Sequence, residues 1–451
     1  MKTWLYIVFI LLTGWQSNAQ QTSQDSLYRL SLEEARQLAL QRNKQVLNAQ
    51  LDILKAKKKV WETTAIGLPQ VTGGFSHNYN IDLPVTLVPA RMFNPQAPEG
   101  TYAELRFGTE HNSKATLSVS QLIFNGSYIV GLQTAKVFKQ LSETKLKQTE
   151  RDIIASVTET YYLVLITREN ARIIDSNYVF VKKLYEETRK MFEAGMVGET
   201  NVKQMEFNLK NMENARQTVR RQLEVAKSLL KLQMGLDLAC RIELTDSLGQ
   251  MEAAVQQGQE LTEKPLVADQ TIDYRLIETQ ERLQELALKN EKAALLPSIG
   301  AFYNHQESMM GDEIKWFDED GKWYKANIIG FNINIPIFGS GQKLARISQA
   351  RIELDKVHNQ KWQMQQNLTM KILQAKVNLQ NAISNYRTQK ENKELSEFIY
   401  ESTRIKYMKG MASGLELTQA QLQYFGTLQQ YYQAILEFWK AKNELDKMFY
   451  Q

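Results

Sequence analysis

Hydrophobic positions recur every seven residues in the second half of the chain. One series comprises Ile347, Leu354, Leu368, Ala375 and Ala382 and is interrupted by Lys361; another comprises Ala350, Val357 and Met364. This spacing is typical of a coiled-coil seam. Further apolar residues lie off the seam, namely Trp362, Met370, Ile372 and Leu373. A solvated two-stranded coiled coil would show a cleaner pattern of two apolar positions in seven. We therefore expect a helix that packs against two neighbours, as in the wall of a cylinder.

Two long stretches contain neither proline nor glycine: 63 residues over 132–194 and 68 residues over 342–409. In a helix interior proline is unfavourable by about 3 kcal/mol and glycine by about 1 kcal/mol. Their absence predicts two continuous helices, each roughly 100 Å long at a rise of about 1.5 Å per residue. Helices of this length must lie side by side to bury their apolar faces.

Four other segments alternate with a period of two residues, over 71–79, 115–120, 299–303 and 329–335. Leu117 and Val119 share one side of their segment, and the residues Ile329, Phe331 and Ile333 share one side of theirs. Such segments fit lipid-facing strands of a membrane barrel, and they fit a soluble sandwich nearly as well. Small barrels need about eight strands. We therefore expect other copies of the chain to complete the barrel, three copies giving twelve strands.

The connections within the two strand pairs differ in length. The first, about 81–112, holds Pro84, Pro89, Pro95 and Pro98, which predict an extended, surface-exposed loop. The second, about 306–325, holds the aromatic residues Trp316, Phe317, Trp323 and Tyr324. These aromatic side chains fit the level of lipid headgroups and fit equally well a role in packing the loop against its neighbours.

The two halves of the chain repeat one another. Pro69 and Pro297 lie 228 positions apart in similar surroundings, Phe124 and Phe338 lie 214 apart, and Gly195 and Gly410 lie 215 apart. Each half reads helix, strand, loop, strand, very long helix, turn and helix. The order predicts two copies of one large unit, a first repeat over 20–236 and a second over 271–451, joined by a linker over 237–270.

The first residues predict export. Lys2 precedes an apolar run over 5–12 and a small-x-small site at Ser17-Asn18-Ala19. This pattern indicates a secretory signal peptide over 1–19, and the run is too short for the alternative of a membrane anchor. No later stretch of about 20 apolar residues could cross a bilayer as a helix, and the mean hydropathy is −0.42. Membrane insertion would therefore require a closed β-barrel.

Charge and candidate chemistry exclude several functions. The formal net charge is +5 with 23% charged residues and no concentrated basic tract, which argues against a nucleic-acid partner. Cys240 is the only cysteine, so no disulfide forms within the chain. The four histidines His77, His111, His305 and His358 show no metal-ligand spacing, and Met309-Met310 is a weak metal signal. Because no hydrolase, zinc-protease or phosphate-loop motif occurs, we predict no enzyme activity, catalytic residue, metal site or cofactor.

The turns after the long helices carry a family resemblance. The second turn reads Tyr407-x-x-Gly410 followed by Glu416-Leu417-x-Gln419-Ala420-Gln421, and the first reads Phe192-x-x-Gly195 followed by Asn201-Val202-x-Gln204. With the signal peptide, the duplication and the paired strands, this resembles the TolC-like outer-membrane efflux proteins over about residues 30–450. The opening segment Leu30-Ser31-Leu32-Glu33-Glu34-Ala35 also resembles the first helix of that family.

The resemblance implies a mainly helical protein with a small β part. It implies a homotrimer in which long antiparallel coiled-coil helices form an α-barrel in the periplasm and four strands per chain form a 12-stranded barrel in the outer membrane. A periplasmic adaptor bound to an inner-membrane pump would dock at the tip, at Phe192, Gly195, Tyr407 and Gly410. The entrance would be narrowed by Asn201, Glu416 and Gln419, a ring less acidic than is usual for the family.

The function expected from this resemblance is an exit duct of a tripartite efflux or type I secretion system. The alternative is an exported coiled-coil scaffold or a periplasmic adaptor. An adaptor would need β-rich domains that flank a single helical hairpin, whereas this sequence predicts two pairs of strands at the ends opposite the glycine turns. Drugs, metals, peptides and whole proteins are all candidate cargoes, because selectivity would reside in the pump.

Overall fold

The computed structural model describes residues 27–318 and 321–450, so the predicted signal peptide lies outside the described residues. The described chain divides into two compact units. One contains residues 27–47, 149–265 and 372–450, and the other contains 48–148 and 266–371. Each unit therefore combines segments from both halves of the sequence.

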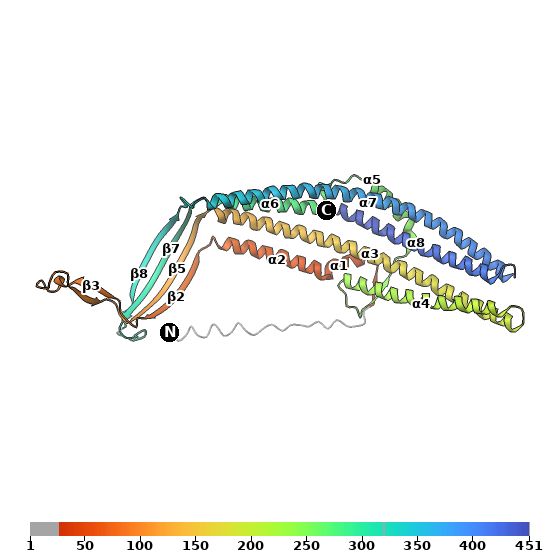
Figure 1. Cartoon of the computed structure of the whole chain (residues 1–451), viewed down its shortest axis with the longest axis horizontal. Helices are drawn as coiled ribbons and strands as arrows, with labels where there is room; N and C mark the ends of the chain where they lie inside the picture. The colour runs from red at the N-terminus through yellow and green to blue at the C-terminus, as the bar shows by residue number, and fades with distance from the viewer. Residues whose placement is uncertain (1–26, 319–320, 451) are drawn as a thin grey trace. The chain divides into compact units, whose positions relative to one another are not determined.

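The second unit contains a β-sheet with the strand order β2-β5-β7-β8 in the described chain (Figure 1). Its strands are β2 (Gln70–Tyr79), β5 (His111–Asn125), β7 (Ser298–Gly311) and β8 (Tyr324–Asn334). All neighbours are antiparallel. The four alternating segments are thus confirmed as strands, and most of them extend beyond the alternation.

The connection between β7 and β8 is shorter than the sequence predicts, 312–323 instead of 306–325. The two strands stay paired through polar positions, where His305 lies opposite Asn327 and Glu307 lies opposite Lys325. The Glu307–Lys325 ion pair spans 3.5 Å. Opposite charges on facing strands stabilise pairing, but they break the apolar alternation by which a strand is recognised.

The proline-rich connection between β2 and β5 is not simply an extended loop. It contains a second antiparallel hairpin of β3 (Val85–Pro89) and β4 (Tyr102–Arg106), with a short 3-10 turn η1 (Ala90–Met92). Pro89 is the last residue of β3, a position at which proline is tolerated in a strand. The hairpin and the turn are exposed over most of their length.

The predicted long helices are α3 (Gly126–Glu193, 68 residues) and α7 (Gln342–Met408, 67 residues). Of the heptad positions in α7, Val357, Leu368, Ala375 and Ala382 are buried, whereas Ile347, Ala350, Leu354 and Met364 are only partly buried. The off-seam residues Trp362, Met370 and Leu373 are exposed, whereas Ile372 is buried. One face of α7 therefore packs within the chain while an apolar stripe on another face is open.

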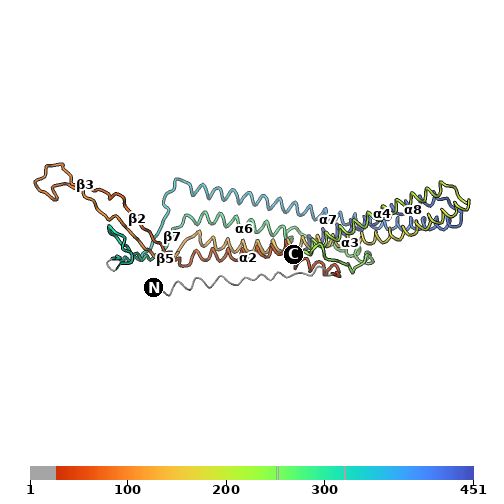
Figure 2. Tube along the Cα trace, turned by 90° about the horizontal axis from the view of Figure 1, so that it is seen from below, coloured from red at the N-terminus to blue at the C-terminus, as the bar shows by residue number. Residues whose placement is uncertain are grey.

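In the first unit, parts of α3 and α7 pack with α4 (Glu199–Gln233) and α8 (Gly414–Phe449) (Figure 2). Asp175 of α3 bonds Arg216 and Arg220 of α4. Tyr162 of α3 stacks on Trp439 of α8. The rings of Tyr400 and Tyr424 join α7 to α8 with centroids 5.4 Å apart. The fully buried side chains of this bundle include Leu379, Leu417, Ile435 and Phe438.

Short elements complete the first unit. The strand β1 (Leu27–Leu30) pairs in parallel with β6 (Arg241–Leu244), and the helices α1 (Leu32–Arg42) and α5 (Met251–Glu263) follow them along the chain. Gly235 has φ +70°, and a Cβ there would lie 2.3 Å from the carbonyl oxygen of Arg42. No larger residue fits at this approach of two backbones.

The order of elements occurs twice. The helices α2 (Lys44–Ala65) and α6 (Ile272–Ala293) have 22 residues each, and each precedes a pair of sheet strands. Each pair is followed by a long helix and then by a helix of 35 or 36 residues. None of the helices in the described part of the chain is long and apolar enough to cross a membrane.

Candidate functional site

The two turns that follow the long helices have the same backbone geometry. Gly195 and Gly410 adopt φ of +74° and +71°. The N–H of Gly195 donates to the carbonyl of Phe192, and the N–H of Gly410 donates to that of Tyr407, at 2.8 and 2.9 Å. A second bond in each turn links the following residue to the carbonyl five positions earlier. These are Schellman motifs, in which glycine takes the left-handed conformation at low cost.

The helices that leave the turns begin differently. The Ser413 Oγ accepts from the N–H of Glu416, and a Glu416 carboxylate oxygen accepts from the N–H of Ser413 at 2.7 Å. This is a capping box, which stabilises the start of α8. At the start of α4 the capping residue is Gly198, which has no side chain to accept such a bond, and Asn201 stands in the place of Glu416.

Two hydrogen bonds join helices of the two sequence halves near these turns. The Tyr407 hydroxyl of α7 lies 3.3 Å from the Thr188 Oγ1 of α3. The Asn208 Nδ2 of α4 donates to the Thr418 Oγ1 of α8 at 2.9 Å, and both residues are buried. The sequence alone does not single out Thr188, Asn208 or Thr418. The available signal was Asn208, a polar residue on an apolar stripe between Met205 and Met212.

The predicted entrance residues lie at the starts of the two shorter helices. Asn201, Glu416 and Gln419 are all exposed. The Asn201 Oδ1 lies 4.0 Å from the point that a Cβ on Gly414 would occupy, so the starts of α4 and α8 are neighbours. The structure of one chain thus gathers these residues at one end of the bundle, together with Phe192 and Tyr407.

The strand register places the predicted lipid-facing residues on one face of the sheet. Val71, Val119, Tyr303 and Ile329 lie side by side across the four strands. Residues two positions away share their face, which adds Leu117, Phe331 and Ile333. We name this side the apolar face. The opposite side carries Thr72, Ser118, Asn304 and Ile328 in the neighbouring row, three polar residues and one exposed apolar residue.

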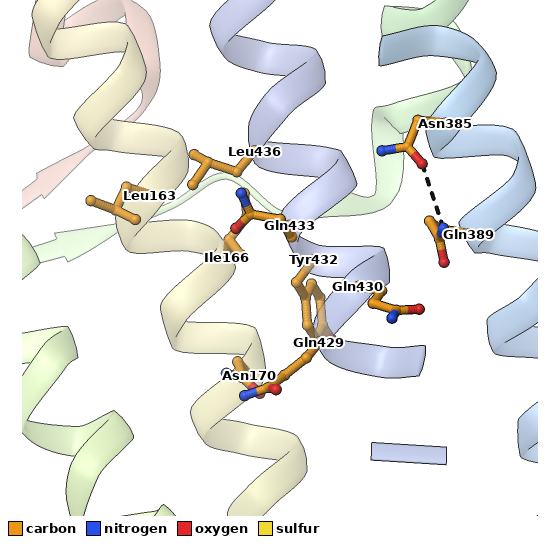
Figure 3. Close-up of a pocket in the computed structure, with 10 residues that line it drawn as sticks. All are labelled: Leu163, Ile166, Asn170, Asn385, Gln389, Gln429, Gln430, Tyr432, Gln433 and Leu436. Atoms are coloured by element: carbon orange, nitrogen blue, oxygen red, sulfur yellow. Dashed lines mark hydrogen bonds between the residues drawn. The ribbon is translucent and has the colours of Figure 1, made fainter. Parts of the chain in front are cut away.

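A groove in the helical bundle has a different character (Figure 3). It has a volume of about 590 Å³ and lies among α3, α7 and α8. Six of its ten lining residues carry side-chain amides: Asn170, Asn385, Gln389, Gln429, Gln430 and Gln433. Burial raises the pKa of the Tyr432 hydroxyl, which also lines it. The amide side chains and the Tyr432 hydroxyl offer hydrogen bonds, and the lining contains no His, Asp, Glu, Lys, Arg or Cys side chain. Elsewhere in the described residues, no three His, Cys, Asp or Glu side chains gather as metal ligands.

A family model described as outer membrane efflux protein matches residues 35–236 and 280–449. The chain belongs to the outer membrane efflux protein family. The match covers both sequence halves, including both glycine turns and the four strands β2, β5, β7 and β8. No curated protein sequence matches the chain significantly.

Solved structures of outer membrane efflux channels share the fold. The CmeC outer membrane channel of Campylobacter jejuni has a TM-score of 0.70 and 18% identity, over 93% of this chain and 85% of that chain. The outer membrane protein VceC of Vibrio cholerae gives 0.66 and 15%, over 92% and 94%. The open-state MtrE outer membrane channel of Neisseria gonorrhoeae gives 0.67 and 16%, over 92% and 88%.

Family membership decides the broad function. This outer membrane efflux protein is a transport conduit in the outer membrane with its helices in the periplasm, and it is not an enzyme. It also decides against the exported scaffold or adaptor that the sequence left as an alternative.

Proposed function

We propose that three copies of this chain form the exit duct of a tripartite efflux or type I secretion system. Each copy would add four strands to a 12-stranded barrel in the outer membrane. The observation that carries this proposal is the sheet itself. In the described chain β2 and β8 are its edge strands, each paired on one side only. Unpaired backbone groups in lipid are unfavourable by several kcal/mol each, so the free edges call for partner strands.

The open face of α7 supports the same assembly. Leu344, Ile352, Trp362 and Met370 are all more than half exposed. At about 100° per residue they fall within one quarter of the helix circumference, on the side away from the buried seam. A neighbouring chain in the trimer would cover this stripe and make the helix part of a continuous wall.

The sheet would be oriented with its apolar face toward lipid. Ile329 is 83% exposed and Phe331 is 71% exposed in the single chain. Large apolar side chains at such exposure are stable against hydrocarbon, whereas the small polar residues Thr72 and Ser118 on the opposite face suit a water-filled exit.

The turns at Gly195 and Gly410 would form the docking tip for a periplasmic adaptor that is bound to an inner-membrane pump. Phe192 is half-exposed, and the residues after the glycines, Met196 and Met411, are 74% and 73% exposed. Methionine side chains adapt to varied partner surfaces. In the trimer, copies of Glu416, Gln419 and Asn201 would surround the entrance. The hydrogen bonds Tyr407–Thr188 and Asn208–Thr418 would help to keep it narrow.

The sequence halves 20–236 and 271–451, joined by 237–270, would be two copies of one ancestral unit. The 22-residue helices α2 and α6 and the nearly equal lengths of α3 and α7 support this division. Because each chain contains two related halves, the wall of a trimer would have approximately sixfold rotational symmetry.

The test is the mass of the protein extracted from outer membranes in mild detergent. A species of three chains with native helix content is expected. A monomer that keeps native helix content would contradict the trimer, because its sheet edges would then be stable without partners. Recovery in the soluble fraction after osmotic shock would contradict insertion in the membrane.

A further inference from the structure

The segment 312–318 that follows β7 is attached to the sheet by Trp316. The Trp316 Nε1 donates to the Ser113 Oγ of β5 at 2.6 Å. The edge of its ring meets Phe75 and His77 of β2, with centroid distances of 5.6 and 5.2 Å and interplanar angles of 88° and 84°. The segment therefore turns back from the end of β7 and lies across β5 and β2.

The register shows on which side of the sheet Trp316 lies. Phe75 is paired with Ala115, and His77 is paired with Ser113. Counted in steps of two along β2 and β5, Phe75, His77 and Ser113 share the face of Val71 and Val119, which is the apolar face. Ser113 and its β7 neighbour Met309 are 3% and 6% exposed. Trp316 thus contacts the apolar face, not the polar face that would line the exit.

The apolar face changes character where the segment lies. From Ile299 to Tyr303 its β7 positions are apolar or aromatic. Beyond Tyr303, Asn327 Oδ1 accepts from the Tyr303 hydroxyl at 3.0 Å and lies 2.7 Å from the His305 Nδ1. The Glu307–Lys325 pair follows in the next row. A transition from apolar residues to aromatic and polar ones marks the boundary between hydrocarbon and headgroups.

We propose that segment 312–318 lies outside the barrel, against the outer-leaflet lipid at this boundary. Trp316 clamps the segment to the sheet, and the apolar side chains of Ile314 and Phe317 contact lipid. Phe317 is 87% exposed and Ile314 is 49% exposed in the single chain, beside the charged residues Asp312, Glu313, Lys315 and Asp318. Lipid is the partner that fits, because the segment continues the apolar face and alternates apolar anchors with charges that suit the headgroup layer. This inference rests on the proposed lipid orientation of that face.

The test places a fluorescent reporter at single cysteines in a Cys240→Ser background. Phe317→Cys, Ile329→Cys and Thr72→Cys are labelled with nitrobenzoxadiazole and reconstituted in phosphatidylcholine vesicles. Quenching by phosphatidylcholine brominated near the start of its acyl chains reports lipid contact, and quenching by iodide reports water. We expect the lipid quencher to act at Phe317→Cys and Ile329→Cys, and iodide alone to act at Thr72→Cys.

Two outcomes separate this inference from the proposed function. Iodide quenching alone at Phe317→Cys, with lipid quenching at Ile329→Cys, would overturn the position of the segment and leave the barrel orientation intact. The absence of lipid quenching at Ile329→Cys would overturn the orientation of the sheet itself.

The clamp has its own test. Trp316→Ala in the Phe317→Cys background is expected to lose most of the lipid quenching and to gain iodide quenching, because the segment is released from the sheet. Trp316→Phe keeps the ring contacts with Phe75 and His77 but not the bond to Ser113, and should retain part of the lipid quenching. Unchanged quenching in Trp316→Ala would contradict the clamp.

Discussion

Glu416 has a local role in the fold and would have a second role in the proposed assembly. Its carboxylate accepts the N–H of Ser413 and thereby completes the start of α8. This role needs only a hydrogen-bond acceptor, which glutamine also supplies. A ring of Glu416 side chains around a threefold axis would need the charge. The two roles can therefore be separated by one substitution.

Glu416→Gln is expected to leave the thermal stability of the protein close to that of the wild type and to reduce cation selectivity in a planar bilayer. The reason is that the capping box would persist while the proposed ring of negative charges would be lost. The matched control is Ser413→Ala, which removes the cap, lowers helix stability by about 1 kcal/mol and retains the charge. Equal ion selectivity in wild type and Glu416→Gln would show that Glu416 has only the capping role.

Residues differ in how far the sequence predicts their structural role. Gly195 and Gly410 were recognisable because a glycine that ends a long glycine-free stretch has a local conformational meaning. The partner of the Tyr407 hydroxyl was not recognisable, because Thr188 lies 219 positions away and the contact depends on how two helices meet.

At the scale of whole elements, strands also differ in how far the sequence predicts them. The alternation of Ile329, Phe331 and Ile333 predicted the face of β8, and the register confirms that these residues share one face. The four-residue strands β1 and β6 are too short for a periodic signal, and their pairing is set by contacts 214 positions apart. The hairpin β3–β4 is not evident from the sequence, because the prolines in this stretch indicate a loop.

The orientation of β8 can be tested with a matched pair of substitutions. Phe331→Asp is expected to impair assembly in the outer membrane, since a charge on the lipid face is unfavourable by up to about 2–4 kcal/mol, less for Asp than for Lys or Arg. Asn332→Asp, one position along on the opposite face, is expected to assemble normally. The readout is the yield of folded protein in the membrane fraction. Equal yields would mean that this part of β8 does not contact lipid.

The contact between α3 and α4 predicts a pH dependence. Partial burial tends to raise the pKa of Asp175, but hydrogen bonds and charges from Arg216 and Arg220 outweigh this and lower the pKa below its ordinary value. A carboxyl whose pKa is lowered by folding stabilises the folded state above its unfolded pKa, and this contribution is lost as the pH falls through the folded pKa.

Asp175→Asn is therefore expected to lower the melting temperature slightly at neutral pH, by an amount that corresponds to about 1 kcal/mol or less for a half-exposed pair. The difference from wild type should shrink as the pH falls below about 4. The measurement is helix content against temperature over a series of pH values. A difference that stays constant down to pH 3 would contradict an ionic role for Asp175.

At the scale of the whole molecule, two hydrogen bonds near the tip join the two sequence halves in the described chain. The bonds Tyr407–Thr188 and Asn208–Thr418 connect α7 to α3 and α8 to α4. A hydrogen bond contributes about 1 kcal/mol, and a trimer would contain three copies of each. Adaptor docking that replaces these contacts would shift the population toward an open state.

Tyr407→Phe combined with Asn208→Ala is expected to raise single-channel conductance in a planar bilayer without changing the yield of trimer. The control is Thr403→Val on the same helix, because in the described chain the Thr403 hydroxyl donates to the carbonyl of Ile399, within α7. Conductance that rises equally in the control would indicate general loosening of the helix. Unchanged conductance in the double variant would place the gate elsewhere.

The two open edges of the sheet also constrain how the proposed ring of chains would assemble. In the described chain β2 and β8 are the edge strands. If chains join edge to edge as proposed, every junction would pair one β2 edge with one β8 edge, so a row would have two free edges whether it contains one chain or two. Dimerisation therefore leaves as many unsatisfied strand edges as the monomer has, and only ring closure removes the last two. In the proposed assembly, partly assembled species should be short-lived, and the curvature of each sheet would set the number of chains at which the ring closes.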